Sequence, residues 1–295
     1  MGSQTQSGVT RLPISPLRYP GGKAGLAPML EATMAAYGAL GGHYAEPFAG
    51  GAGAAMRLLG SGAAGVVHIN DCDPLVHAFW SAVVADADRF IERIWSVPLT
   101  VDEWRRQRFV QQHSAEFSPF DVGFAAFFLN RCSRSGLITR SGPIGGYAQG
   151  GPWRVDARFN RAELSKRVAF VGEHRGRIHV YGLDAVDFLR RMRRRNRVFI
   201  YLDPPYVLNG SRLYLNHYRD ADHRRLASYV LRWLRGHPWV LSYDDAPLIR
   251  GLYAPCVMVP LSIRHSVQNK GRGTEVLILP PDAPPSAIAN LPGRI

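Results

Sequence analysis

The stretch Val198–Tyr206, V-F-I-Y-L-D-P-P-Y, constrains the fold of this 295-residue chain more than any other. Its first five residues are β-branched, aromatic or aliphatic without polar alternation, which indicates a strand buried on both faces of a parallel sheet. Pro204 and Pro205 end the strand because neither has an N–H to donate and each favours extended geometry before it. We therefore expect an α/β fold with Asp203 at the carboxyl edge of the sheet, where such sheets bind ligands.

The groups that follow this strand suit a planar amine: the Asp203 carboxylate, the Pro204 carbonyl and the Tyr206 ring. An exocyclic amine on a nucleobase is a poor nucleophile because its lone pair is delocalised into the ring. If the Asp203 carboxylate and the Pro204 carbonyl each accept one N–H, the lone pair turns toward an electrophile while Tyr206 stacks on the ring. The alternative is an ordinary proline-rich turn in which Asp203 caps a backbone N–H.

The charge of the chain predicts a polyanionic partner. Lys and Arg number 36 against 23 Asp and Glu, giving a net charge of +13, and basic side chains bind nucleic-acid phosphates by releasing counterions. An arginine-rich genome is the alternative explanation.

The cysteines and the hydropathy of the chain indicate the cellular compartment in which the protein works. The three cysteines are far apart and form no C-x-x-C pair, which argues against a disulfide framework or a zinc site and indicates a reducing compartment. No run approaches the roughly 18 apolar residues of a membrane span, and the first residues lack signal-peptide features. We expect a cytoplasmic protein with no membrane or metal partner.

A glycine-rich segment near the start, Pro16–Lys23, reads P-L-R-Y-P-G-G-K and precedes an apolar helix. Gly21 and Gly22 let the backbone approach a ligand closely, and the helix start offers free N–H groups to a carboxylate. Lys23 could add a charge and Tyr19 a stacking face. A simple helix-entry turn is the alternative.

The next segment has the layout of a nucleotide-binding unit. His43–Phe48 is predicted to be a strand, Ala49–Met56 a glycine-rich turn that opens a helix, and Val66–Asp71 a second strand that ends in an acid. Asp71 lies twenty residues beyond Gly51, a spacing at which the acid takes ribose hydroxyls. An NAD enzyme is therefore an alternative. The turn lacks the last glycine or alanine of G-x-G-x-x-G/A, which S-adenosylmethionine (SAM), having no pyrophosphate, does not require.

Residues 86–173 interrupt the alternation of strands and helices. Helices are predicted over 89–95, 101–113 and 120–130, and the aromatics at helical spacing in the last one predict core packing. Asn130–Trp153 then carries glycines at turn spacing, which indicates an exposed hairpin or loop. Three of its arginines could reach phosphates or guanine edges: Arg131, Arg134 and Arg140. A solvated basic loop is the alternative.

The sheet is predicted to resume with Arg177–Tyr181, after which Asp184 would join Asp71 and Asp203 on one rim. Further elements are predicted as a helix over 222–235, a strand over 238–243 and an antiparallel pair, 257–263 with 275–279. The proline- and alanine-rich end from residue 280 is predicted to be a disordered tail, and residues 1–15 a polar one.

Seven motifs together resemble, in order, those of the Dam-like DNA adenine-N6 methyltransferases. They are P-L-R-Y-P-G-G-K, A-E-P-F-A-G-G-A-G, N-D-C-D-P, the triplet R-F-N, L-D-P-P-Y, L-S-Y-D-D and K-G-R-G-T-E-V-L-I. The resemblance covers Pro16 to Pro280. It departs from the F-x-G-x-G pattern of the family, because alanine stands at position 52.

The resemblance implies a fold, a domain division and an activity. The fold is a SAM-dependent, Rossmann-like mixed sheet with helices on both faces, plus a mainly helical target-recognition insertion with a β-hairpin. The catalytic domain would comprise 16–85 and 174–280, the insertion 86–173, and the tails 1–15 and 281–295. The activity is methyl transfer from SAM to the N6 amine of an adenine flipped out of double-stranded DNA. Apart from the resemblance, we expect a monomer that uses no metal.

The resemblance also implies site residues, which we name by role. The catalytic residues are Asp203, Pro204 and Tyr206. The cofactor-binding residues are Tyr19, Gly22, Lys23, Phe48, Gly50, Asp71, Asp184 and Asp203. The DNA-binding residues, in a hairpin within 130–149, are Arg131, Arg134, Arg140 and Tyr147. Alternative acceptors are cytosine N4, RNA or a protein glutamine, and a non-catalytic module that binds SAM or DNA is the alternative from another class.

Overall fold

The computed structural model describes residues 15–18, 22–207, 218–261, 275–289 and 291. Its centre is a seven-stranded sheet in the order β3-β2-β1-β4-β5-β7-β6. The strands are β1 His43–Glu46, β2 Val66–Asn70, β3 Ile178–Tyr181, β4 Val198–Leu202, β5 Trp239–Asp244, β6 Val257–Leu261 and β7 Glu275–Leu279. The first five run parallel, and β7 is antiparallel to β5 and β6. The predicted mixed α/β sheet is confirmed.

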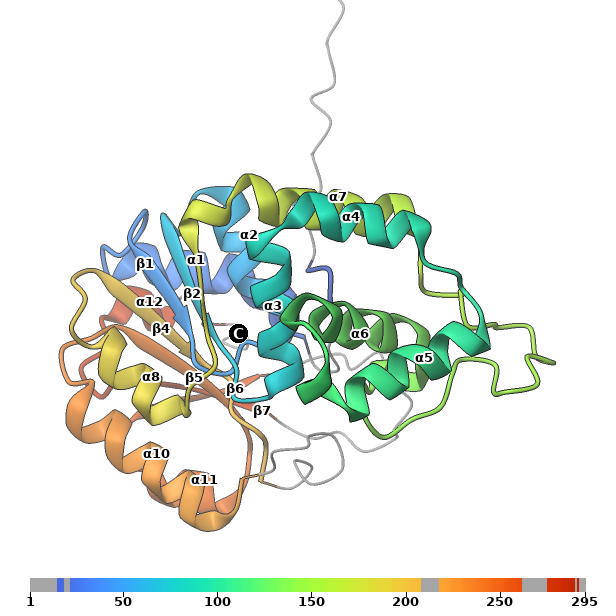
Figure 1. Ribbon diagram of the computed structural model, residues 1–295. Coiled ribbons are helices and arrows are strands. Elements are labelled where there is room, and N and C mark those ends of the chain that lie inside the picture. The colour runs from blue at the N-terminus through green and yellow to red at the C-terminus, as the bar shows by residue number, and fades with distance from the viewer. Residues whose placement is uncertain (1–14, 19–21, 208–217, 262–274, 290, 292–295) are drawn as a thin grey trace, which may run out of the picture.

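Helices cover both faces of this sheet (Figure 1). The longer ones are α1 Ala27–Ala36, α2 Gly53–Ser61, α3 Pro74–Ala85, α4 Ala87–Ser96, α5 Val101–Gln112, α6 Pro119–Cys132, α7 Arg161–Glu173, α8 Ala185–Met192, α10 Asp220–Trp233, α11 Pro247–Leu252 and α12 Pro285–Ala289. Four short 3-10 turns are η1 Lys23–Leu26, η2 Ser114–Glu116, η3 Arg134–Gly136 and η4 Arg175–Arg177.

The central strand β4 divides the core into two clusters. Phe199 and Tyr201 point into the cluster that α1, α2, α3 and α12 cover, while Val198, Ile200 and Leu202 point into the one under α8, α10 and α11. All five side chains are buried, because successive side chains of a strand alternate between faces and both faces are covered. The absence of polar alternation in the sequence reflects this double burial.

Of the helices between residues 87 and 173, α4, α6 and α7 pack onto α3 and α5 packs onto α6, with α5 and α6 in the right-hand part of Figure 1. The Phe79 ring of α3 stacks on the Phe127 ring of α6 with their centroids 5.8 Å apart. Gly123 makes this approach possible, since a Cβ there would lie 2.5 Å from the carbonyl oxygen of Ala78. Phe124, Phe127 and Phe128 are buried, so their predicted role in the core is confirmed.

Two predictions about irregular segments need correction. Residues 281–289 are not a disordered tail, because α12 buries Ala287 against the core and Leu291 beyond it is also buried. Within 130–149 the structure has one isolated antiparallel bridge, Ser133 to Pro143, instead of a two-stranded hairpin. The reason is that α6 extends to Cys132 and the 3-10 turn η3 spans Arg134–Gly136, which leaves no extended strand at the start of this segment.

In the part of the chain that the structure describes, no helix combines the length and the apolar character needed to cross a membrane.

Candidate active site

The carboxyl edge of the parallel strands gathers the predicted acids. Asp71 follows β2, Asp184 follows β3 and Asp203 follows β4. β1 lies between β2 and β4 in the sheet. The chain therefore adds β2 and β3 on one side of β1 and later adds β4 and β5 on its other side. Ligands of open α/β sheets bind at such a switch point.

Asp203 begins the turn after β4 and is fixed by its neighbours. The Ser242 hydroxyl on β5 donates to Asp203 Oδ1 over 2.6 Å, and Ser242 in turn lies 2.9 Å from the Tyr201 hydroxyl. The Asp203 side chain remains 23% exposed. Burial raises its pKa, opposed by the Lys23 ammonium and the Ser242 hydrogen bond. The carboxylate is therefore oriented at the rim through contacts to its Oδ1 atom.

Lys23 links the first glycine-rich segment to the D-P-P-Y corner. Its Nζ lies 3.5 Å from Asp203 Oδ1 and donates to Glu275 Oε2 over 3.0 Å and to the Tyr206 hydroxyl over 2.5 Å. Burial alone would lower the pKa of Lys23, but the attraction of Asp203 and Glu275 outweighs it and raises that pKa. One buried cation thus compensates two acids that would otherwise repel each other.

The glycine-rich turn after β1 is fixed by the acid after β2. The Gly50 N–H donates to Asp71 Oδ2 over 2.8 Å, and the Asp73 N–H donates to Oδ1 over 2.9 Å. Burial raises the pKa of Asp71 to about 6 although these bonds oppose the shift. Ala52 has φ 45°, in the left-handed region that favours glycine. The chain therefore keeps the turn conformation where the family pattern has glycine.

A small cleft opens between this turn, Lys23 and Asp203. It is lined by Gly22, Lys23, Glu46, Ala49, Gly50, Gly51, Ala52, Gly53, Ala54, Tyr201 and Asp203. The N-terminus of α2 borders it and presents backbone N–H groups, which favour an anion. The cleft thus combines acids that suit a cation with a helix end that suits a carboxylate.

Glu46 is the buried acid of this cleft and is 5% exposed. Its Oε1 accepts hydrogen bonds from the Tyr44 hydroxyl over 2.8 Å and from the Ala55 N–H over 3.0 Å. Burial nevertheless raises the pKa of Glu46 to about 8. The carboxyl is therefore largely protonated at neutral pH when no cation lies beside it.

A family model, D12 class N6 adenine-specific DNA methyltransferase, matches residues 19–265. The chain belongs to this family. It is an adenine-specific DNA methyltransferase, and its family implies SAM as the methyl donor. A search of curated proteins found no match.

Two further predicted cofactor residues of the methyltransferase, Asp184 and Phe48, lie along the same rim. Asp184 caps α8 through the Val186 N–H and forms an ion pair with Arg225 at 2.6 Å. The Phe48 ring meets the Tyr218 ring edge-on, with centroids 5.7 Å apart. Tyr19 lies outside the described residues.

The predicted DNA-binding residues divide into exposed and buried ones. Arg134, Arg140 and Tyr147 are exposed on the insertion. Arg131 is only 8% exposed, and its guanidinium donates to the Pro16 carbonyl, with Nε at 2.8 Å. The assignment of Arg131 as a DNA contact is therefore wrong. It lies on the inward face of α6, three residues after the buried Phe128.

Sequence reasoning missed four residues that shape the site of the methyltransferase: Glu46, Tyr201, Ser242 and Glu275. Three of them lie inside motifs that carried the family resemblance, A-E-P-F, L-S-Y-D-D and K-G-R-G-T-E-V-L-I. An acid or hydroxyl in a strand that is otherwise buried is the signal that could have found them, because buried polar groups need partners.

Proposed function

We propose that this methyltransferase moves the methyl group of SAM directly to the N6 amine of an adenine rotated out of double-stranded DNA. SAM, when bound, would supply the electrophilic methyl group and leave as S-adenosylhomocysteine, while the methylated amine would lose one N–H proton. The observation that carries the proposal is the position of Asp203, which Ser242 and Lys23 hold at the mouth of the cleft. Rotation of the base spends a few kcal/mol on unstacking.

The residues of the cleft fit the methionine end of SAM by their chemistry. That end carries a carboxylate, an ammonium and a sulfonium, which match the N-terminus of α2 and the acids Glu46 and Asp203. Phe48, Asp71 and Asp184 would hold the adenosine end along the rim. Lys23 would act chiefly by setting the charge of the corner.

Asp203 and Pro204 would act on the target amine as acceptors. Two acceptors on one amine localise its lone pair, and this stabilisation grows as the nitrogen becomes cationic in the transition state. Tyr206 would stack on the adenine ring, its hydroxyl anchored by Lys23. Alignment at this corner would supply most of the acceleration.

We further propose that residues 86–173 recognise the DNA, while 16–85 and 174–280 form the catalytic part. Arg134, Arg140 and Tyr147 would face the duplex. Because α12 packs on the catalytic core, residues 281–289 belong with that part. The packing of Gly123 on Ala78 supports a fixed position of α6 relative to α3.

The experiment that tests this function is sequencing and nucleoside analysis of DNA from cells that express the gene. We expect N6-methyladenine at one short sequence, absent from cells that express the Asp203→Asn variant. N4-methylcytosine, or methyl label only in RNA or protein, would contradict the proposal and favour one of the alternative acceptors.

The buried Glu46 predicts a pH-dependent affinity for SAM. Its pKa of about 8 in the free protein should fall when a cation binds beside it, so that binding releases a proton. SAM should therefore bind more tightly as pH rises from 6 to about 8, up to about tenfold per pH unit. Equilibrium binding of tritiated SAM across this range measures the effect.

The control for this prediction is a pair of conservative variants. Glu46→Gln should remove the pH dependence and weaken SAM binding at pH 8. Glu103→Gln, at a buried glutamate on α5, should leave both as in the wild type. An unchanged slope in Glu46→Gln would show that another group titrates.

A further inference from the structure

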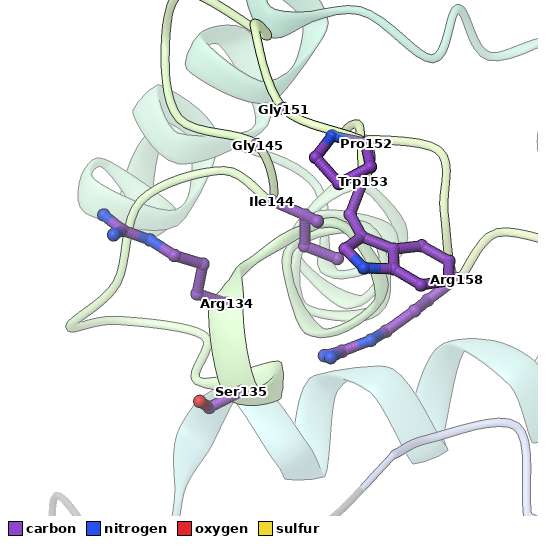
Figure 2. A pocket seen from close by; sticks show the side chains of 8 residues that line it. All are labelled: Arg134, Ser135, Ile144, Gly145, Gly151, Pro152, Trp153 and Arg158. Carbon is purple, nitrogen blue, oxygen red and sulfur yellow. The ribbon is translucent and has the colours of Figure 1, made fainter.

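A second hollow lies on the insertion, away from the SAM cleft. It has a volume of about 440 Å³, and Trp153, Arg134, Arg158 and Ile144 are among the residues that line it. Figure 2 shows the Arg158 side chain extending beneath the indole of Trp153 and beside Ile144, whereas the guanidinium of Arg134 points away from them. This volume falls within the range of roughly 300 to 1,000 Å³ typical of small-ligand sites.

Trp153 gives the hollow an aromatic wall. Its side chain is 70% exposed, the highest value among the exposed large hydrophobic side chains that the structure describes. An exposed indole beside cations is suited to stacking on a nucleobase, because every base presents a π-face. The neighbouring Ile144 and Pro152 extend the apolar surface.

Arg158 supplies a positive charge beside this wall. Its Nη1 is buried without a hydrogen-bond partner, and burial together with the charge of Arg18 lowers its pKa. Across residues 15–18, 22–207, 218–261 and 275–289, neither Arg134 nor Arg158 has an acid within ion-pair distance. Uncompensated guanidinium groups of this kind favour a phosphate.

The loop that forms the hollow is held in shape. The Gln149 amide donates to the Ile144 carbonyl over 2.7 Å, and its oxygen accepts the Val155 N–H over 2.8 Å. Gly145 has φ 80°, and a Cβ there would lie 2.5 Å from the Trp153 carbonyl oxygen. The two sides of the loop can meet only with glycine at this position, so the hollow is built into the fold.

We propose that this hollow binds one unstacked nucleotide of the DNA other than the target adenine. Trp153 stacks on its base, and Arg158 binds its phosphate. The inference rests on the proposed function, in which the corner at Asp203 takes the target base. A phosphate alone would need no apolar wall, whereas a nucleotide uses both the indole and the guanidinium of Arg158.

The test compares three tryptophan variants: Trp153→Leu, Trp153→Phe and Trp233→Leu. The measurements are fluorescence anisotropy of a labelled duplex that contains the mapped methylation site, and KM for that duplex in methyl transfer. Trp153→Leu should raise Kd and KM by about tenfold, since base stacking on an aromatic contributes roughly 5- to 150-fold in affinity. Trp153→Phe should stay within about threefold of the wild type because the ring is retained.

Trp233 on α10 offers a matched control. It is 46% exposed and lies against Arg193 and Arg232, so Trp233→Leu removes the same chemistry far from the hollow and should leave Kd unchanged. Equal thermal midpoints would establish that the variants are folded. Wild-type affinity in Trp153→Leu, or a Trp153→Phe variant as weak as Trp153→Leu, would overturn the inference.

The phosphate contact has its own readout. Arg158→Gln should reduce the slope of log Kd against log salt by about 0.9, the value for one phosphate contact, while Arg232→Gln on α10 should leave the slope unchanged. An unaltered slope in Arg158→Gln would remove phosphate binding from the inference. If the wild type methylates no DNA, the proposed function itself fails; if it does and the variants bind normally, only this inference fails.

Discussion

Replacing Asp203 with asparagine should reduce methyl transfer to DNA by a hundredfold to a thousandfold or more. The Ser242 hydroxyl can still donate to the amide oxygen, so the side chain should keep its position. What is lost is the negative charge that stabilises the developing cation on the adenine nitrogen, and preorganised electrostatic groups of this kind contribute about 10² to 10³ in rate.

Incorporation of tritium from labelled SAM into duplex DNA measures this loss, with both substrates saturating. Asp187→Asn is the matched control, because Asp187 is an exposed acid on α8 that pairs with Arg190, and it should keep full activity. Anisotropy with labelled duplex should show that Asp203→Asn still binds DNA. Activity within tenfold of the wild type would remove Asp203 from the catalytic role.

Replacing Lys23 with methionine should destabilise the protein and make methyl transfer depend on alkaline pH. The Lys23 and Glu275 side chains are both nearly inaccessible, and removal of one partner from a buried pair costs about 3 to 5 kcal/mol. Burial raises the pKa of Asp203, and Lys23 opposes that rise. Without Lys23 the pKa of Asp203 should rise further.

The sign of the pH effect follows from this pKa. Asp203 carries the negative charge that stabilises the developing cation only when it is ionised, so its protonation lowers activity at pH values below its pKa. In Lys23→Met we expect methyl transfer to fall by about tenfold for each pH unit below the raised pKa of Asp203, and to recover as pH rises. The pH profile of kcat measures the shift.

A double variant separates charge from packing. Lys23→Met with Glu275→Gln removes one positive and one negative charge, so it should regain part of the unfolding free energy and shift the pH profile back toward neutrality. Chemical denaturation and the same pH profile provide the comparison. A single variant with the wild-type profile would contradict the charge-compensating role of Lys23.

Local sequence patterns predicted most of the sheet because burial has a direct signature in a strand. Val198–Leu202 lacks polar alternation, and both faces of β4 are indeed covered. The errors arose where that signature is weak. Ala287 buries little surface, so a proline- and alanine-rich end resembles a disordered tail although α12 packs on the core.

The wrong prediction that Arg131 contacts DNA could have been avoided, because the helical period of the sequence already indicates that this residue is buried. It follows Phe124, Phe127 and Phe128 at spacings of seven, four and three residues, which places it on the same buried face of a helix. The arginine side chain suggested a DNA contact, but its position on the buried face of α6 keeps it away from the surface. The Pro16 carbonyl satisfies the guanidinium instead of a phosphate.

The sequence by itself determined the parallel α/β core, the order of the motifs and the acid at the end of β4. Only the tertiary structure decided which charged groups form ion pairs, because Lys23 and Glu275 are 252 positions apart in the sequence. Local patterns report how each segment is buried, whereas ion pairs such as this one depend on how distant strands and helices meet. That long-range contact sets the electrostatics of the corner on which the proposed methyl transfer depends.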